Sequence, residues 1–308
     1  MTQSTADAYL PSEAFLRRRR LTDLGMRVLL FLSAALSVFV TAAIIYVLVS
    51  ESWGFFSEVS VWTFLTDTEW TPVFAQPRYG ILPLLTATLW AAGIAIVIAI
   101  PLGTVLAVYL SEYAPAAVRE TVKPILELLG AVPTVVYGYF ALLFLTPLFQ
   151  TFIPGLTGFN LLVPGIVLGI MILPYIVSIS EDAMRAVPAS LREGAYALGM
   201  TRLQTTFRVI IPGAFSGITA AYLLGMSRAV GETMVLAIAA GQNPNLTADP
   251  REGAATITSY IVQMSMGDLP HGSLAYQTIF AAGLALFILT LFFNIVGFFL
   301  RRRFREAY

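Results

Sequence analysis

Residues 82–110 read LPLLTATLWAAGIAIVIAIPLGTVLAVYL, a stretch that contains no charged side chain. A helix of about 20 apolar residues crosses the ~30 Å hydrocarbon core of a bilayer, so this stretch is long enough to span a membrane. Other long apolar stretches lie at residues 25–50, 125–149, 160–180, 213–240 and 274–300. The sequence therefore predicts an all-α membrane protein whose six transmembrane helices occupy residues 25–300.

The composition of the chain supports this fold class. Of the 308 residues, 57% are hydrophobic and only 12% are charged. A soluble domain carries about 25% charged residues, so this chain has too few charges to cover a surface that faces water. The chain contains no cysteine, which excludes disulfides, thiolate metal sites and a cysteine nucleophile.

Prolines interrupt the third and fourth apolar stretches. Pro133 and Pro147 fall in the third stretch, and Pro164 and Pro174 in the fourth. Such prolines are tolerated when neighbouring helices satisfy the freed carbonyl groups, so they indicate a packed bundle with broken third and fourth helices. The first stretch follows four arginines and could imitate a secretory signal. Its length and the lack of a small-residue cleavage site favour a retained helix.

The distribution of basic residues predicts the orientation. Of the 18 basic residues, all but Arg78, Arg228 and Arg251 fall in segments that share one side of the membrane. Lysine and arginine are enriched in cytoplasmic loops. We therefore expect an inner (plasma) membrane protein with a cytoplasmic N-terminal segment, residues 1–24, and a cytoplasmic basic tail, residues 301–308.

Two residue types that are nearly absent exclude further chemistry. His271 is the only histidine, so one chain cannot form a multi-histidine metal site. Lys123 is the only lysine and follows Val122, so the chain lacks the Gly-Lys pair with which a Walker A loop binds phosphates. We therefore predict a subunit that is not an enzyme and holds no cofactor, with any ATP and magnesium bound by partner subunits.

The inner loop at residues 181–212 predicts two short helices separated by a glycine turn. Two pairs of residues have the spacing of a capping box, in which each side chain satisfies a backbone N–H group at a helix start: Ser190 with Glu193, and Thr201 with Gln204. Gly199 suits the left-handed position that ends a helix. Pro212 then marks the entry to the next span.

The first of these short helices has an apolar face formed by Leu191, Ala195 and Leu198. Nothing else in the loop covers this face. One interpretation is that it sits in a groove on another protein. The alternative is that it packs on the inner ends of the neighbouring transmembrane helices.

The same loop carries a family signature. Glu193-Gly-Ala, three residues, Gly199, nine residues and Val209-Ile-Ile-Pro212 resemble the permease signature of ABC importers, Glu-Ala-Ala, three residues, Gly, nine residues, Ile-x-Leu-Pro. This chain departs from it at Gly194, Val209 and Ile211. The resemblance implies a type I ABC importer permease bundle. It also implies a coupling helix that inserts into a cleft of an ATPase subunit through the following residues: Leu191, Glu193, Gly194, Ala195, Gly199 and Pro212.

The predicted fifth helix contains two charged residues, Arg228 and Glu232. A lone charge at this depth costs about 2.5–3.5 kcal/mol on insertion scales. Four residues separate the two, so on a continuous helix they share a face and can pair. One interpretation is an anion passage in which Glu232 masks Arg228 between turnovers, since guanidinium binds phosphate through two parallel hydrogen bonds. The alternative is an ion pair that only fixes helix packing.

The sequence around this pair resembles the phosphate-specific importer permeases, most of all their C-type subunit. The resemblance rests on Ser227-Arg-Ala-Val-Gly-Glu-Thr-Met234, Val132-Pro-Thr-Val-Val-Tyr-Gly138 and Glu181-Asp-Ala-Met-Arg-Ala-Val-Pro188. It implies a phosphate passage at Arg228 and Glu232, flanked by Ser227 and Thr233. It also implies a bilayer-embedded complex with a similar A-type permease, two ATPase subunits and an extracytoplasmic phosphate-binding protein, and no nucleic acid partner.

Three other classes of function compete with this interpretation. The chain could be the A-type sister subunit, or a permease for another oxyanion such as sulfate or molybdate, because an arginine would serve any of them. A membrane-embedded enzyme would need several buried acidic or histidine clusters, and the sequence has one charged pair. A signalling platform that reports phosphate status is a separate class, which the residues neither support nor exclude.

Overall fold

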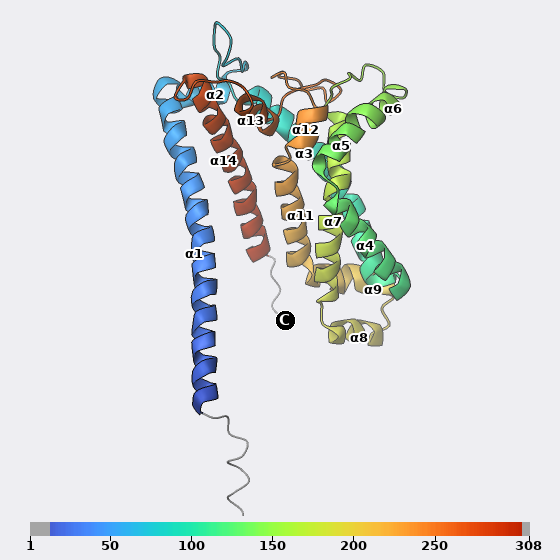
Figure 1. Ribbon diagram of the computed structural model, residues 1–308. Coiled ribbons are helices and arrows are strands. Elements are labelled where there is room, and N and C mark those ends of the chain that lie inside the picture. Colours follow the sequence, from blue (N-terminus) through green and yellow to red (C-terminus); the bar gives the residue numbers. More distant parts are fainter. Residues whose placement is uncertain (1–12, 304–308) are drawn as a thin grey trace, which may run out of the picture. The chain divides into compact units, whose positions relative to one another are not determined.

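The computed structural model describes residues 13–303 of the chain. In that range it contains helices and no strand, apart from an isolated bridge between Trp70 and Tyr79 (Figure 1). The predicted all-α fold is therefore confirmed. The predicted cytoplasmic segments, residues 1–24 and 301–308, lie partly outside the described residues, and their side of the membrane stays a prediction. The chain divides into two compact units, with the boundary between Glu51 and Ser52. Each unit is described by itself.

The first unit is formed by helix α1, which spans Glu13–Glu58 and so continues into the second unit. Its 46 residues extend about 69 Å at 1.5 Å per residue, well beyond the hydrocarbon core. The helix is longer than the predicted stretch at residues 25–50 in both directions. No proline occurs between residues 13 and 58, so nothing in the local sequence stops the helix earlier.

The second unit contains the remaining helices. In chain order they are α2 (Val61–Thr66), α3 (Leu82–Val108), η2 (Tyr109–Tyr113), α4 (Ala116–Ala131), α5 (Thr134–Phe140), η3 (Ala141–Leu145), α6 (Thr146–Gln150), α7 (Leu162–Arg185), α8 (Ala189–Ala197), α9 (Arg202–Thr205), η4 (Thr206–Ile210), α10 (Ile211–Gly213), α11 (Phe215–Val230), α12 (Met234–Ala239), α13 (Ile257–Ser265) and α14 (Leu274–Arg303). The segments η2, η3 and η4 are π-helical turns, which are rare and frequently occur at functional sites.

The number of helices able to cross a membrane agrees with the predicted six if bent helices are counted as single spans. Four described helices are long and apolar enough to cross alone: α1, α3 with η2, α7 and α14. Two further pairs pass the same test together. Helix α4 is bent by 87° from the segment α5–α6, and α9–α10 is bent by 71° from α11.

The prolines of the third and fourth predicted helices have different effects. Pro133 lies between α4 and α5 in an extended conformation, with ψ 133°, so residues 125–149 do not form one straight helix. Helix α7 is continuous through Pro164 and Pro174, which corrects the prediction that they break it. Pro164 lies in the first turn, where a missing N–H group costs no helical bond. Pro174 is buried among neighbouring helices, an environment in which a membrane helix tolerates proline.

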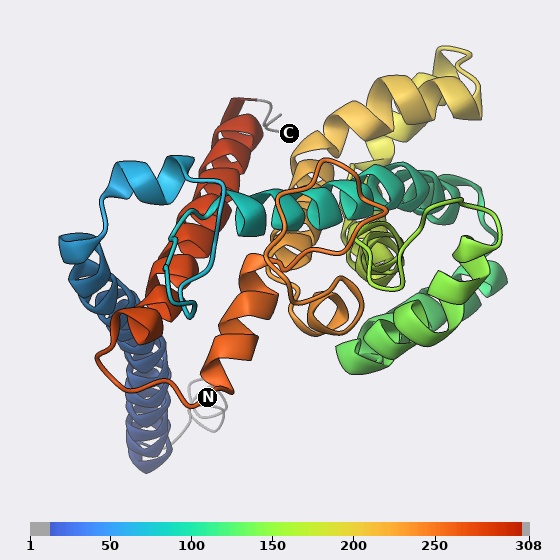
Figure 2. The same cartoon turned by 90° about the horizontal axis from the view of Figure 1, so that it is seen from above.

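Helix α7 is the centre of the second unit. Viewed from above, it lies between α3 and the segment α5–α6, and it contacts α3, α5 and α11 (Figure 2). Its contact with α3 uses glycines four residues apart, Gly165 and Gly169, as is common where membrane helices approach closely. A Cβ atom on Gly169 would lie only 3.0 Å from the carbonyl oxygen of Ala95 in α3. The two backbones therefore meet directly.

Candidate functional site

The fifth predicted helix is interrupted where its charged residues lie. Helix α11 ends at Val230 and α12 begins at Met234, so the predicted continuous helix at residues 213–240 is wrong. The carboxylate of Glu232 lies in the break and accepts the backbone N–H groups of Met234 at 3.2 Å and Val235 at 3.5 Å. Its backbone carbonyl accepts the hydroxyl of Thr258 at 2.8 Å. Glu232 therefore caps the start of α12.

The structure does not pair Arg228 with Glu232, which corrects the interpretation from their spacing. Among the ion pairs of residues 13–303, none includes either side chain. The spacing argument assumed a continuous helix, and the break at residues 231–233 removes that geometry. Glu232 is only 8% exposed and already accepts backbone N–H groups, so its charge is compensated without the arginine.

Arg228 instead contacts an aromatic ring. Its guanidinium carbon lies 4.5 Å from the centre of the Tyr175 ring, which belongs to α7. Its Nε atom is buried and has no hydrogen-bond partner, and the neighbouring hydroxyl of Ser227 is buried without a partner as well. A cation over an aromatic face gains about 0.5–2 kcal/mol, less than a buried charge needs for full compensation. The site therefore retains unused hydrogen-bond donors beside a positive charge.

Tyr175 also lines a cavity of about 380 Å³ between α4 and α7. The cavity has one acidic side chain, that of Glu127 on α4. Arg228 and Ser227 were predicted from the sequence, whereas Tyr175 and Glu127 were not, because no local pattern predicts which residues of α7 and α4 face one another or α11. The complete lining is Glu127, Gly130, Ala131, Pro174, Tyr175, Ser178 and Ile179.

A second charged cluster joins α4 to α7 near the end of α7. The ammonium of Lys123 lies 2.7 Å from a carboxylate oxygen of Glu181 and 2.7 Å from one of Asp182. Arg185 lies 3.4 Å from the other oxygen of Glu181. Glu181 is 1% exposed, so its charge depends on these partners. The fourth predicted helix ends at residue 180, so the burial of Glu181 was not predicted from the sequence.

The inner loop folds largely as predicted, with one difference. The second capping box is present: the Gln204 N–H group donates to the hydroxyl of Thr201 at 3.3 Å, and the Thr201 N–H group donates to Gln204 at 2.9 Å. The first is absent. Helix α8 begins after Pro188, which places Ser190 inside the first turn, where it cannot act as a cap.

The predicted apolar face of α8 is divided between the two interpretations. Ala195 is buried against the rest of the chain, while Leu191 is 36% exposed and Leu198 is 84% exposed. Glu193 and Gly194 are exposed beside them. Pro212 lies at the start of α10, just before the bend into α11. A helix that is anchored by the buried Ala195 and exposes Leu198 at its end suits contact with another protein.

Gly199 ends this region in the left-handed conformation, with φ +78°, as the sequence predicts. A side chain there costs about 1–2 kcal/mol. We expect Gly199→Ala to lower the free energy of unfolding by about 1 kcal/mol for this reason. Gly194 is the control, because it lies inside α8 with nothing within 4 Å of an added Cβ atom. Gly194→Ala should be neutral or stabilise by about 0.5–1 kcal/mol. Thermal unfolding in detergent measures both, and equal effects would contradict the backbone explanation.

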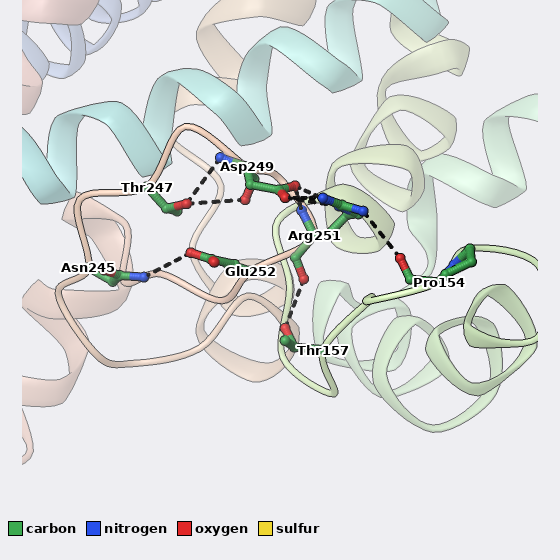
Figure 3. A network of polar contacts seen from close by, with 7 residues as sticks. All are labelled: Pro154, Thr157, Asn245, Thr247, Asp249, Arg251 and Glu252. Carbon is green, nitrogen blue, oxygen red and sulfur yellow. Dashed lines mark hydrogen bonds and ion pairs between the residues drawn. The ribbon is translucent and has the colours of Figure 1, made fainter.

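Two loops at the opposite end of the second unit are joined by polar contacts (Figure 3). The guanidinium of Arg251 pairs with Asp249 at 2.5 Å and donates to the carbonyl of Pro154 at 3.2 Å. The carbonyl of Arg251 accepts the hydroxyl of Thr157 at 2.8 Å. Asn245, in the same loop, donates to Glu252 at 3.4 Å. These contacts hold residues 245–252 against residues 154–157.

This loop contact should depend on pH. Hydrogen bonds from the Arg251 side chain, followed by its backbone N–H group, lower the pKa of Asp249 from 3.8 to about 2. Because folding lowers this pKa, its stabilisation is complete above pH 3.8 and is lost as the pH falls through about 2. Over that range we expect the N–H group of Leu162, which donates to the Pro250 carbonyl, to exchange faster relative to its intrinsic rate. In the Asp249→Asn variant this pH dependence of Leu162 exchange should be absent. If the variant shows the same pH dependence as wild type, other titrating groups cause it.

Comparison with known proteins identifies the family. Residues 99–306 match the family described as binding-protein-dependent transport system inner membrane component. The chain is 40% identical to the probable ABC transporter permease protein YqgH of Bacillus subtilis over 77% of both chains. It is 33% identical to the phosphate transport system permease protein PstC of Mesorhizobium japonicum, over 90% of this chain and 89% of that one.

Solved structures share the fold. A bacterial ABC transporter involved in the import of the acidic polysaccharide alginate superposes with a TM-score of 0.65 at 16% identity, covering 94% of this chain and 100% of that one. The MetNI methionine ABC transporter superposes with a TM-score of 0.54 at 21% identity, covering 74% of this chain and 95% of that one. The chain therefore belongs to the binding-protein-dependent transport system inner membrane components, among the PstC-like ABC permeases, and is a multi-pass protein of the inner membrane.

Proposed function

We propose that this chain is the C-type permease subunit of an ATP-driven phosphate importer and forms half of its translocation pathway. A similar A-type permease would form the other half. Two ATPase subunits would bind ATP and magnesium, and an extracytoplasmic binding protein would deliver phosphate. The observation that carries the proposal is Arg228, a half-buried cation in an apolar bundle whose ring contact leaves hydrogen-bond donors unused. Its relatives named as phosphate transport permeases support the choice of substrate.

The partner of Arg228 suits an anion that must bind and leave. A carboxylate paired with Arg228 would compete with phosphate for the same donors. The Tyr175 ring holds the cation through its face and leaves the N–H groups available to an oxyanion. Binding then requires no ion pair to break, and one arginine gives too little affinity to trap the ion. Ser227 has a buried hydroxyl without a partner beside it, and Thr233 lies half-buried three residues past the end of α11.

The proposed role of Glu232 differs from the one that its spacing from Arg228 indicates. It holds the chain break between α11 and α12 through its contacts with the N–H groups of α12 and with Thr258. The break ends α11 two residues after Arg228, so Glu232 helps to determine where the arginine lies. In this proposal Glu232 positions the passage and does not mask its charge.

Helix α8 is proposed to couple the passage to the ATPase subunits. Its exposed residues Leu191, Glu193, Gly194 and Leu198 are available to a partner, and the buried Ala195 anchors the helix to the rest of the chain. The chain itself has no motif that binds nucleotide phosphates. Its only lysine, Lys123, is engaged with Glu181 and Asp182. The chain would therefore act as a non-catalytic subunit. The distribution of its basic residues favours a cytoplasmic location for both termini.

Transport by the reconstituted complex tests this proposal. The permeases, ATPase subunits and binding protein are placed in proteoliposomes, and uptake of radiolabelled phosphate, sulfate and molybdate is measured with ATP on the ATPase side. We expect ATP-dependent phosphate uptake that excess unlabelled phosphate, and not sulfate, suppresses. Uptake of sulfate or molybdate without phosphate would overturn the substrate. Lack of any uptake by an assembled complex that hydrolyses ATP would favour a signalling role.

A further inference from the structure

Helix α8 is tied to the bundle by a buried ion pair. One guanidinium nitrogen of Arg192 lies 2.8 and 2.7 Å from the two carboxylate oxygens of Glu112, and the other donates to the carbonyl of Met184 at 2.6 Å. The side chain of Glu112 is 4% exposed and that of Arg192 is 22% exposed. Both charges are thus largely withdrawn from water, where a charge-assisted contact is strong and its loss leaves an uncompensated charge.

The acidic partner lies in an irregular segment. Glu112 belongs to the π-helical turn η2, which continues α3 directly, and Ser111 donates to its carboxylate at 2.7 Å. A second contact reaches the same turn from the other side of the Gly199 bend: the guanidinium of Arg202 in α9 lies 5.8 Å from the centre of the Tyr113 ring. Residues on both sides of this bend therefore hold one five-residue segment.

Helix α3 in turn contacts the helix that carries Arg228. The hydroxyl groups of Thr104 in α3 and Tyr222 in α11 lie 2.5 Å apart. Arg228 follows Tyr222 on the same helix. Close packing of α3 on α7 at Gly169 adds a rigid contact with the helix that carries Tyr175. A displacement of α3 would thus reach both helices of the site, α11 with Arg228 and α7 with Tyr175.

From these contacts we propose that Arg192 and Glu112 form the connection through which movement of α8 displaces α3 and thereby the Arg228 region. This inference rests on the proposed role of α8 in coupling to ATPase subunits. Arg192 and Glu112 are positioning residues, since neither lies at the cavity or at Arg228. The π-turn that holds Glu112 supports this assignment, because a π-turn can relax to an α-helix and shift the register of the helix end.

Charge exchange distinguishes this connection from a merely structural pair. The variants Arg192→Glu, Glu112→Arg and the double exchange are compared in the reconstituted complex, with Arg192→Lys as the conservative variant. Two quantities are measured: basal ATPase activity, and phosphate transported per ATP hydrolysed in the presence of the loaded binding protein. Arg208→Glu is the control, because Arg208 is exposed and takes part in no ion pair among the described residues.

We expect each single variant to assemble and retain basal ATPase activity within about twofold, while transport per ATP falls about tenfold or more. The double exchange should restore phosphate transport per ATP to within about threefold of wild type. Arg192→Lys should be intermediate, since lysine keeps the positive charge but lacks the planar guanidinium and its parallel N–H donors. Arg208→Glu should leave the ratio unchanged.

Three results would overturn the connection: single variants with a normal ratio, an assembled double variant without recovery, or single variants that do not assemble. A wild-type complex that does not transport phosphate refutes the proposed function instead. In that case, stimulation of the ATPase activity by the binding protein replaces the transport ratio, with the same expected order of variants.

Discussion

Phosphate uptake is expected to fall about 10- to 100-fold when Arg228 is replaced by glutamine, while the complex still assembles and hydrolyses ATP. Hydrogen bonds to a charged group contribute about 1.5–3 kcal/mol, and each 1.4 kcal/mol corresponds to a factor of ten. Glutamine keeps a polar side chain but removes the positive charge beside Tyr175. Initial rates of radiolabelled uptake and ATPase activity, measured on the same proteoliposomes, give the result.

Two further variants make this result specific. Arg228→Lys keeps the charge but loses the planar fork, so its uptake should lie between glutamine and wild type. Arg78→Gln removes an exposed arginine that pairs with the half-buried Asp67 in the loop before α3, and this variant should transport normally. If Arg228→Gln transports at the wild-type rate, Arg228 has a structural role only, and the anion passes elsewhere in the complex.

Replacing Gly169 with leucine is expected to destabilise the bundle by about 1–3 kcal/mol. A Cβ atom there would meet the Ala95 carbonyl oxygen at 3.0 Å and the Cβ atom of Ile98 at 3.2 Å, so α3 and α7 must separate. Overpacking between backbones has no flexible side chain to absorb it. Thermal unfolding in detergent measures the change, and each kcal/mol lowers Tm by about 2–4 °C in a domain of this size.

Gly93 provides the matched control. It lies in α3, and nothing is found within 4 Å of an added Cβ atom. Gly93→Leu adds the same side chain to the same helix pair on the open side, so it should leave Tm near the wild-type value. A similar loss of stability in both variants would mean that leucine disturbs α3 itself and not its contact with α7.

The apolar pattern and local chemistry predict much of this fold. Runs of about 20 apolar residues identify membrane helices without knowledge of their neighbours, because the bilayer sets the required length. Gly199 and the capping box of Thr201 with Gln204 also depend only on nearby backbone, and both are confirmed. The comparisons with known proteins confirm the family indicated by the loop around Glu193.

The surroundings of Arg228 could not be predicted in this way. Its partner Tyr175 lies on another helix, and the choice among residues of α7 depends on how α7 packs against α11. The spacing of Arg228 and Glu232 was interpreted on an unbroken helix, whereas α11 ends at Val230 with Gly231 as its C-cap. Thr258, which helps to hold the break, is also far from Glu232 in the sequence, 26 residues away. Tertiary contacts overrode a local rule.

The contact of Lys123 with Glu181 and Asp182 makes this protein a suitable subject for chemical probing. Lys123 carries the only lysine amine of the chain, and both carboxylates hold it protonated at 2.7 Å. Acylating reagents need an unprotonated, accessible amine, so modification is slow while α4 and α7 stay joined. The acylation rate of one peptide, read by mass spectrometry, therefore reports how often these two helices separate during turnover, without any engineered label.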